Sequence, residues 1–570
     1  MNRSVSEIDD PNFFLSKDGK TNPESELIET IKSLYNESQF DDNSTACRYP
    51  ARKLWLQKKL DLQLLPEVNC MKFDALMKKL DPHSTTLVFP NAHINSPASM
   101  FGHTFLRIDS KYQSKLLSYA VNYSADANQD TENSAIYAYK GIFGGYPGLY
   151  SLLAYTDKLK EYRDTDRRDI WEYELNLTKE ETILMMNHIW ELNSVYSWYY
   201  FFSENCSYNM LWLLEIARPS ISLRDNFTYF VTPPATIQAI YEENFISKQN
   251  FRPSKRTTLL AYEDALGSQK IIFCDAVAKS ERKIEEIIDN ENILLQEKQY
   301  MLESIALLLE YYYLNNKIGK EVYVKKLHKT LTLRAQLGKG KKLEVKKGAN
   351  PDEAHKTTRL KVEGIYRNSE YLGLLGVRPS YHTLDDIGLG FLEGTQIEFF
   401  DAQFTYMQKS SGKNSLAVEK LTLISIASYT KLSALFRPMA YGMSGGWNQD
   451  SLINRAQFST DVNFGVSFGT RHTYIYTLME NSVYVGGEFV SNITAAVGAK
   501  VGLVSSHGKY FQTNIDAKWR YYDSLEDQKV LHVSEHLRLE KNHTLSFGFD
   551  YVEKSNEDQK SMKVSYDYFF

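Results

Sequence analysis

The sequence predicts an α+β domain, a helical connector and a C-terminal transmembrane antiparallel β-barrel of about twelve strands. Two short motifs in the first half of the chain predict the α+β domain, and a change to period-two hydrophobicity near Thr358 predicts the barrel. We therefore divide the chain into an N-terminal extension (1–45), an α+β domain (46–250), a helical connector with a basic linker (251–350) and a barrel (356–570).

The first motif, FGHTFLRID at 101–109, is typical of a strand that presents a histidine. His103, Phe105 and Arg107 share one face by period two, and Gly102 permits a close backbone approach.

The second motif, SENCSYNMLWLLE at 203–215, predicts a helix that begins at Cys206, with Ser203 or Asn205 as its N-cap. A thiol at a helix N-terminus lies in the positive end of the macrodipole, which favours the thiolate. An imidazole within reach, such as that of His103, takes the proton. Alone, each residue is more often structural; together they predict a cysteine nucleophile and its base.

Gly102-His103-Thr104-Phe105 and Asn205-Cys206-Ser207 resemble the Lnb N-terminal periplasmic domain, which is similar to circularly permuted NlpC/papain-like cysteine folds. The resemblance runs from about Thr85 to about Arg218 and includes 119–123 and the Gly-rich segment 141–148. Family members named Lnb are lipoprotein N-acyltransferases. The resemblance therefore implies transfer of an acyl chain from a phospholipid donor, through a thioester on Cys206, to a lipoprotein amine.

Within that mechanism His103 is the base, and Asn122, or Ser118 by the same spacing, orients its ring. The Cys206 N–H stabilises the oxyanion, with Asn205 and Ser207 as neighbouring candidates. The aromatic run before the nucleophile offers candidates for an acyl-chain groove, although core packing explains it equally well: Trp198, Tyr199, Phe201 and Phe202.

Two other functions stay open at this point. A cysteine peptidase or amidase would use the same Cys206 and His103 on a cell-wall or protein substrate, and a non-catalytic barrel would carry an adaptor domain. We expect no cofactor and no catalytic metal. The net charge of -5 gives no global attraction to nucleic acid.

Cys47 and Cys70 flank an amphipathic segment and pair if the domain folds in an oxidising compartment; two free thiols are the alternative. The first residues lack the features of a signal peptide, which a periplasmic protein needs. We therefore expect that a native signal has been removed and Met1 added.

Helical composition rich in Glu, Lys and Leu covers 280–309 and 319–337, followed by a basic, Gly-rich linker at 338–348. We interpret the linker as a solvated loop, with contact to anionic head groups as the alternative.

From Thr358 onward, apolar and polar residues alternate over segments of about ten residues or more, as in 458–468, 511–521 and 562–570. An apolar outer face, a polar inner face with both charge signs, and aromatics near strand ends are typical of Gram-negative outer-membrane barrels, and 39 Tyr and 29 Phe suit them. The aromatic terminal strand resembles the signal read by the outer-membrane assembly machinery. An even strand number predicts an N-terminal domain in the periplasm.

Overall fold

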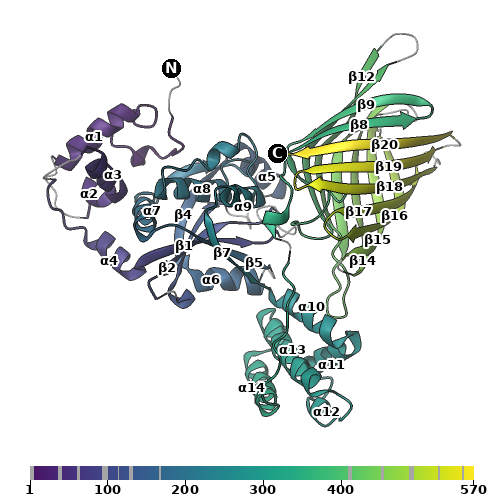
Figure 1. The fold of residues 1–570 in the computed structure, drawn as a ribbon, viewed down its shortest axis with the longest axis horizontal. Helices are drawn as coiled ribbons and strands as arrows, with labels where there is room; N and C mark the ends of the chain where they lie inside the picture. Colours follow the sequence, from purple (N-terminus) through teal and green to yellow (C-terminus); the bar gives the residue numbers. More distant parts are fainter. Residues whose placement is uncertain are drawn as a thin grey trace. The chain divides into compact units, whose positions relative to one another are not determined.

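We describe the protein from a computed structural model. It describes residues 5–35, 42–60, 65–92, 101–112, 114–127, 133–165, 168–348, 350–408, 414–450, 455–470, 472–486, 493–523, 527–554 and 557–570. The chain forms two compact units, Met1–Ser254 and Lys255–Phe570, and each is described by itself (Figure 1).

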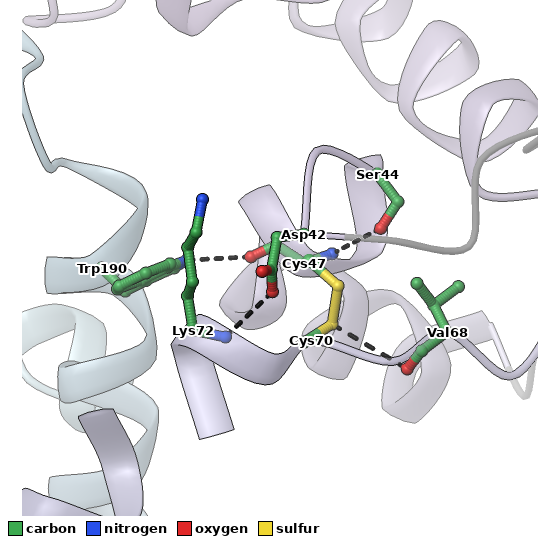
Figure 2. The surroundings of a disulfide bond; sticks show 7 residues. All are labelled: Asp42, Ser44, Cys47, Val68, Cys70, Lys72 and Trp190. Atoms are coloured by element: carbon green, nitrogen blue, oxygen red, sulfur yellow. Dashed lines mark hydrogen bonds between the residues drawn. A yellow bond between two sulfur atoms is a disulfide. The ribbon is translucent and has the colours of Figure 1, made fainter. Parts of the chain in front are cut away.

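The first unit begins with an N-terminal helical lobe, which we define as residues 5–80. It contains α1 (Pro23–Tyr35), α2 (Thr45–Arg48), α3 (Pro50–Leu60) and α4 (Met71–Leu80). A disulfide joins Cys47 to Cys70 with 5.2 Å between their Cα atoms, which confirms the predicted pairing (Figure 2). The Trp190 indole N–H donates to the Cys47 carbonyl oxygen at 2.8 Å and ties the lobe to α7 (Lys179–Glu191).

A seven-stranded antiparallel sheet follows, in the order β6-β4-β3-β2-β1-β5-β7. Its strands are β1 (Pro82–Pro90), β2 (Phe105–Ser110), β3 (Tyr119–Ala125), β4 (Tyr146–Ala154), β5 (Ile170–Leu175), β6 (Tyr196–Tyr199) and β7 (Ile246–Arg252). The other helices include α5 (Ser134–Phe143), α6 (Tyr155–Leu159), α8 (Cys206–Ala217) and α9 (Pro233–Glu242).

Alternation along β2 divides the core of this unit between the two faces of the sheet. Leu106 and Ile108 join the main core, which includes Leu211 and Leu214 of α8. Phe105 joins a smaller core on the other face with Tyr155 and other residues. Burial on both faces makes β2 a rigid support for the residues that precede it.

The second unit opens with α10 (Lys255–Leu266), α11 (Ser268–Lys279), α12 (Glu285–Ile288), α13 (Leu295–Leu314) and α14 (Lys320–Gln336). The sequence prediction of helix throughout 280–309 was wrong, because a turn separates α12 from α13. The Asn290 side chain accepts a hydrogen bond from the Asn292 N–H at 2.9 Å, a local bond that favours a turn over a helix. Helix α10 lies within the predicted helical connector, 251–350, but outside its two stretches of helical composition.

The barrel strands are β8 (Arg359–Arg367), β9 (Glu370–Arg378), β11 (Thr395–Gln408), β12 (Asn414–Ser428), β13 (Ala440–Asp450), β14 (Arg455–Gly469), β15 (Thr473–Gly486), β16 (Ile493–His507), β17 (Phe511–Tyr522), β18 (Asp527–Glu540), β19 (His543–Lys554) and β20 (Glu557–Phe569). Neighbours pair antiparallel, and the pairings β20–β8 and β9–β11 close the ring. The short β10 (Ser380–His382) extends the β9 side along β11. Among the described residues the barrel thus has twelve strands, as predicted.

The two faces of the barrel differ in polarity. On β20, Met562, Val564 and Tyr566 are exposed on the outer face, whereas Ser565 and Asp567 are buried inside. The lumen contains ion pairs, such as Arg520 with Glu480 at 3.2 Å and with Asp461 at 3.4 Å. An apolar belt around a polar lumen is the pattern of a barrel surrounded by lipid.

The interior of the barrel also holds an inward segment, which we define as residues 383–394. The Gln512 amide of β17 donates to the carbonyl oxygens of Leu384 and Asp386 at 2.9 and 2.8 Å. Arg378 forms a buried ion pair with Asp386 at 2.6 Å. No helix in the described parts of the chain is long and apolar enough to cross a bilayer.

Candidate active site

The nucleophile candidate, Cys206, is the first residue of α8, as the sequence predicts. Asn205 is the N-cap: its Oδ1 accepts hydrogen bonds from the N–H groups of Ser207 and Tyr208 at 3.0 and 3.3 Å. Its Nδ2 donates to the carbonyl oxygens of Phe201 and Val231 at 3.1 and 2.7 Å. Because cap and loop contacts occupy this side chain, we reassign Asn205 from oxyanion stabiliser to the residue that fixes the helix start.

His103 lies just before β2, not within a strand as predicted from alternation. The reason is Gly102, whose φ of +98° is left-handed. A Cβ at this glycine would lie 2.4 Å from the Phe89 ring, so only glycine permits this approach. The sharp backbone turn places the buried imidazole beside Tyr162, with 5.9 Å between ring centroids.

The orienting residue is Asn122 of β3. Its Oδ1 lies 2.7 Å from His103 Nε2, and its Nδ2 donates to the Ser124 hydroxyl at 3.4 Å. The alternative candidate, Ser118, instead donates to the Asp109 carboxylate at 2.5 Å. With Nε2 held by Asn122, the second ring nitrogen of His103 is left for the thiol.

The thiol interacts directly with this histidine. Burial raises the pKa of Cys206, but the charge of His103 and hydrogen bonds with His103, the Thr104 N–H and Ser207 outweigh it. The net effect lowers the pKa from 9.0 to about 7. Cys206, His103 and Asn122 therefore converge in the geometry of a nucleophile, a base and the group that orients the base.

Tyr199 lies at this site, although the sequence pointed to an acyl groove. Its hydroxyl oxygen accepts a hydrogen bond from the Cys206 N–H at 3.4 Å. Burial, followed by the charge of Cys206, raises the pKa of Tyr199 well above 10.0, so the phenol stays protonated. Its ring stacks on Tyr123 at 5.8 Å. The hydrogen bond between the Tyr199 hydroxyl and the Cys206 N–H joins residues of different elements, and a sequence pattern carries no signal for it.

The hydroxyls of Ser207 and Thr104 link the nucleophile helix to the histidine loop. Thr104 Oγ1 donates to Ser207 Oγ at 2.8 Å, and this oxygen lies 3.8 Å from Cys206 Sγ. Ser207 thus lies beside the Cys206 sulfur. This position agrees with its prediction as a residue next to the nucleophile.

The remaining candidates for an acyl-chain groove are three aromatic residues, some in the interior and some at the surface. Phe201 is interior packing: a Cβ at Gly141 would lie 2.3 Å from its ring. Trp198 on β6 is 37% exposed. Phe202 contacts Phe101, beside the histidine loop, with 6.4 Å between centroids. Of the four predicted groove residues, only Trp198 and Phe202 thus retain a position from which a groove could be lined.

Acidic side chains collect next to the nucleophile. Burial, then the charges of Glu7 and Asp9, raises the pKa of Glu204 to about 7. Glu7 accepts a hydrogen bond from the Tyr208 hydroxyl at 2.7 Å, and Asp9 accepts one from the Trp198 N–H at 2.7 Å. Within the described residues, no group of three or more His, Cys, Asp or Glu side chains is arranged to hold a metal ion.

Comparison with known proteins places these features in families. Residues 72–243 match the model of the Lnb N-terminal periplasmic domain. Residues 348–569 match a domain of unknown function, DUF7840, and residues 1–59 match another, DUF7843. No curated protein matches the chain.

Several solved outer-membrane proteins match part of the chain at low similarity. A loop-deletion mutant of OmpT from Vibrio cholerae is 7% identical, with 37% of this chain and 97% of that chain covered and a TM-score of 0.20. The KdgM porin is 10% identical, with 37% and 99% covered and a TM-score of 0.22. An outer membrane channel from Pseudomonas putida F1 is 11% identical, with 38% and 96% covered and a TM-score of 0.24.

The apolar exterior of the barrel and the match of the N-terminal unit to a periplasmic domain place the protein in the outer membrane, with its N-terminal domain in the periplasm. Residues 72–243 thus match the Lnb N-terminal periplasmic domain, and the same chain continues into a β-barrel of outer-membrane type with twelve strands, counted over the described residues.

Proposed function

We propose that this protein is a cysteine acyltransferase at the periplasmic face of the outer membrane. It moves an acyl chain from a phospholipid to the amine of a lipoprotein. The observation that carries the proposal is the arrangement of Cys206, His103 and Asn122, in which a thiol of lowered pKa adjoins an oriented imidazole.

In the first step the Cys206 thiolate attacks the ester carbonyl carbon of the phospholipid. A C–S bond forms, the ester C–O bond breaks, and the imidazolium of His103 gives its proton to the leaving alkoxide. The Cys206 N–H, which donates to the Tyr199 hydroxyl oxygen at 3.4 Å, and that hydroxyl itself are our candidates for the donors that stabilise the oxyanion.

In the second step the acceptor amine attacks the thioester carbonyl carbon. The C–N bond forms, the C–S bond breaks, and His103 takes the amine proton as the thiolate is restored.

The test is mass spectrometry of the purified full-length protein after incubation with a diacyl phospholipid. We expect one hydroxylamine-sensitive acyl adduct on Cys206 and none in Cys206→Ala. Cys274→Ala is the matched control, because burial raises the pKa of Cys274 to about 12 and this thiol should not react. Cleavage of a peptidoglycan peptide without any lipid adduct would replace the proposal with an amidase.

A further inference from the structure

The exposed side of α3 carries a mixture of apolar and basic side chains that the proposed reaction does not use. Leu54 and Trp55 are 44% and 47% exposed. Lys58 and Lys59 follow them by four residues each, so each lysine lies on the same helix face as an apolar residue. Lys53 adjoins the same face.

Helix α1 enlarges the apolar part of this surface. Its Leu27 and Ile28 are exposed. Leu27 and Trp55 both line a cavity of about 620 Å³, a size typical of sites for small molecules. The charged residues of the lining are paired: Glu26 with Arg52, Glu191 with His188, and Glu215 with Arg224. The other apolar side chains of the lining are Phe13, Phe14, Pro23, Ala51, Leu56, Leu184, Ile216 and Pro219.

The charges around this surface are unbalanced. Glu26 of α1 pairs with Arg52 at 2.5 Å, and Glu29 pairs with Lys32 at 2.8 Å. Over the described part of the chain, Lys53, Lys58 and Lys59 form no ion pair with an acidic side chain. An apolar surface rimmed by unpaired lysines is complementary to a surface that is apolar inside and anionic outside.

We propose that this face of α1 and α3 docks on the surface of an anionic phospholipid bilayer. Leu54 and Trp55 then lie at the boundary between head groups and acyl chains, where tryptophan is favoured, and the three lysines face the phosphates. The groove between Leu27 and Trp55 accommodates an apolar tail at that boundary. An acidic protein partner would match the lysines but gives no role to an apolar groove of this volume.

The test uses the full-length protein in lipid nanodiscs with phosphatidylglycerol, and a benzophenone amino acid in place of Trp55. After irradiation, mass spectrometry measures lipid adducts at this position. Tyr112, which is 71% exposed in the same unit, carries the benzophenone in the control. We expect at least tenfold more lipid adduct at position 55 than at position 112.

Charge reversal provides the second arm. In Lys53→Glu/Lys58→Glu/Lys59→Glu the adduct at position 55 should fall at least tenfold, since each lysine near an anionic surface is worth about fivefold in affinity. High salt or nanodiscs of phosphatidylcholine should also reduce it. Circular dichroism checks that the variant folds.

Three results would overturn the proposal: equal adducts at positions 55 and 112, an adduct that is insensitive to charge reversal, or cross-linking of position 55 to a second copy of the chain. The last would assign the face to an interface between copies. The proposal does not depend on the acyl-transfer chemistry, so Cys206→Ala should give the same adduct yield as the wild type.

Discussion

The two antiparallel sheets of this chain have the same strand geometry but differ in what surrounds their two faces. In the seven-stranded sheet, β2 is buried along its whole length: Leu106 and Ile108 pack in the main core on one face, and the other face holds Phe105 and the buried ion pair of Arg107 with Asp109 at 2.8 Å. In the barrel, β15 alternates residue by residue: Val483 is exposed on the outside and Ser482 is buried within. Alternation along the sequence therefore identifies a strand. Whether the buried side chains are polar or apolar indicates whether each face of the sheet meets protein, water or lipid.

The comparison predicts its largest effect beside the first sheet, where the proposed base His103 is a buried polar group. His103→Ala should lower the rate of thioester formation by about 10²–10⁴-fold, as expected for loss of a general base. Single-turnover acylation followed by mass spectrometry measures the rate. His83→Ala, on β1, is the matched control and should keep the wild-type rate. Equal rates in both variants would remove His103 from the mechanism.

The N-terminal helical lobe depends on a covalent link that the barrel does not have. Cys47→Ser/Cys70→Ser should destabilise the lobe by about 3 kcal/mol, because the disulfide, which joins residues 23 positions apart, no longer restricts the unfolded chain. Hydrogen exchange of residues 42–60 and 65–80 in the full-length protein reports this change. Unchanged protection in these segments would show that the Trp190 contact and apolar packing suffice.

The barrel exterior offers the opposite test. Val564, near the middle of β20, is 50% exposed, so in water a lysine there would cost almost nothing. In lipid, Val564→Lys should cost about 2–4 kcal/mol. Urea unfolding in phospholipid vesicles measures this cost, with Tyr112→Lys in the N-terminal unit as an exposed control. Equal stability of the two variants would contradict a lipid-facing exterior.

The pH dependence of alkylation should differ between the two free thiols, Cys206 and Cys274. Alkylation by iodoacetamide should accelerate as pH rises through about 7, because the thiolate reacts and its pKa is lowered to that value. In His103→Ala the midpoint should rise towards 9.0, since the main lowering charge is gone. Cys274, whose pKa burial raises to about 12, should not react below pH 9. Peptide mapping separates the two sites.

The smallest effect concerns two helix caps of the same unit. Asn205→Ala and Thr178→Ala should each cost about 0.5–2 kcal/mol, because each side chain accepts a hydrogen bond from the first turn of its helix. Only Asn205→Ala should also change the alkylation midpoint of Cys206. A shift of the same size in Thr178→Ala would make the effect global rather than local.

Local signals predicted much of this structure. Helix α8 follows from a capping residue at its start, apolar residues at helical spacing, and Pro219 just beyond its last residue. The strands at 458–468 and 511–521 follow from alternation and lie within β14 and β17, and the strand at 562–570 extends one residue past the end of β20. Such features depend on neighbouring residues along the chain, which a single sequence displays.

Tertiary contacts account for what the sequence could not provide. The choice of Asn122 over Ser118 depends on a 2.7 Å contact between Asn122 of β3 and His103, which precedes the neighbouring strand β2. The position of Tyr199 at the thiol depends on how β6 meets the start of α8. The occupied side chain of Asn205 depends on Val231, 26 residues later in the chain. None of these contacts has a spacing or composition that would reveal it in advance.

The closure of the barrel also has a kinetic consequence. β8 pairs with β20, so residues near position 360 form their strand pairing with residues about two hundred positions later in the chain. Such high contact order predicts slow folding. Until β20 arrives, both edges present unpaired N–H and C=O groups, which are open to wrong pairing with other chains. The terminal strand therefore determines when the barrel stops being prone to aggregation, and a chaperone that covers the β8 edge would act in this interval.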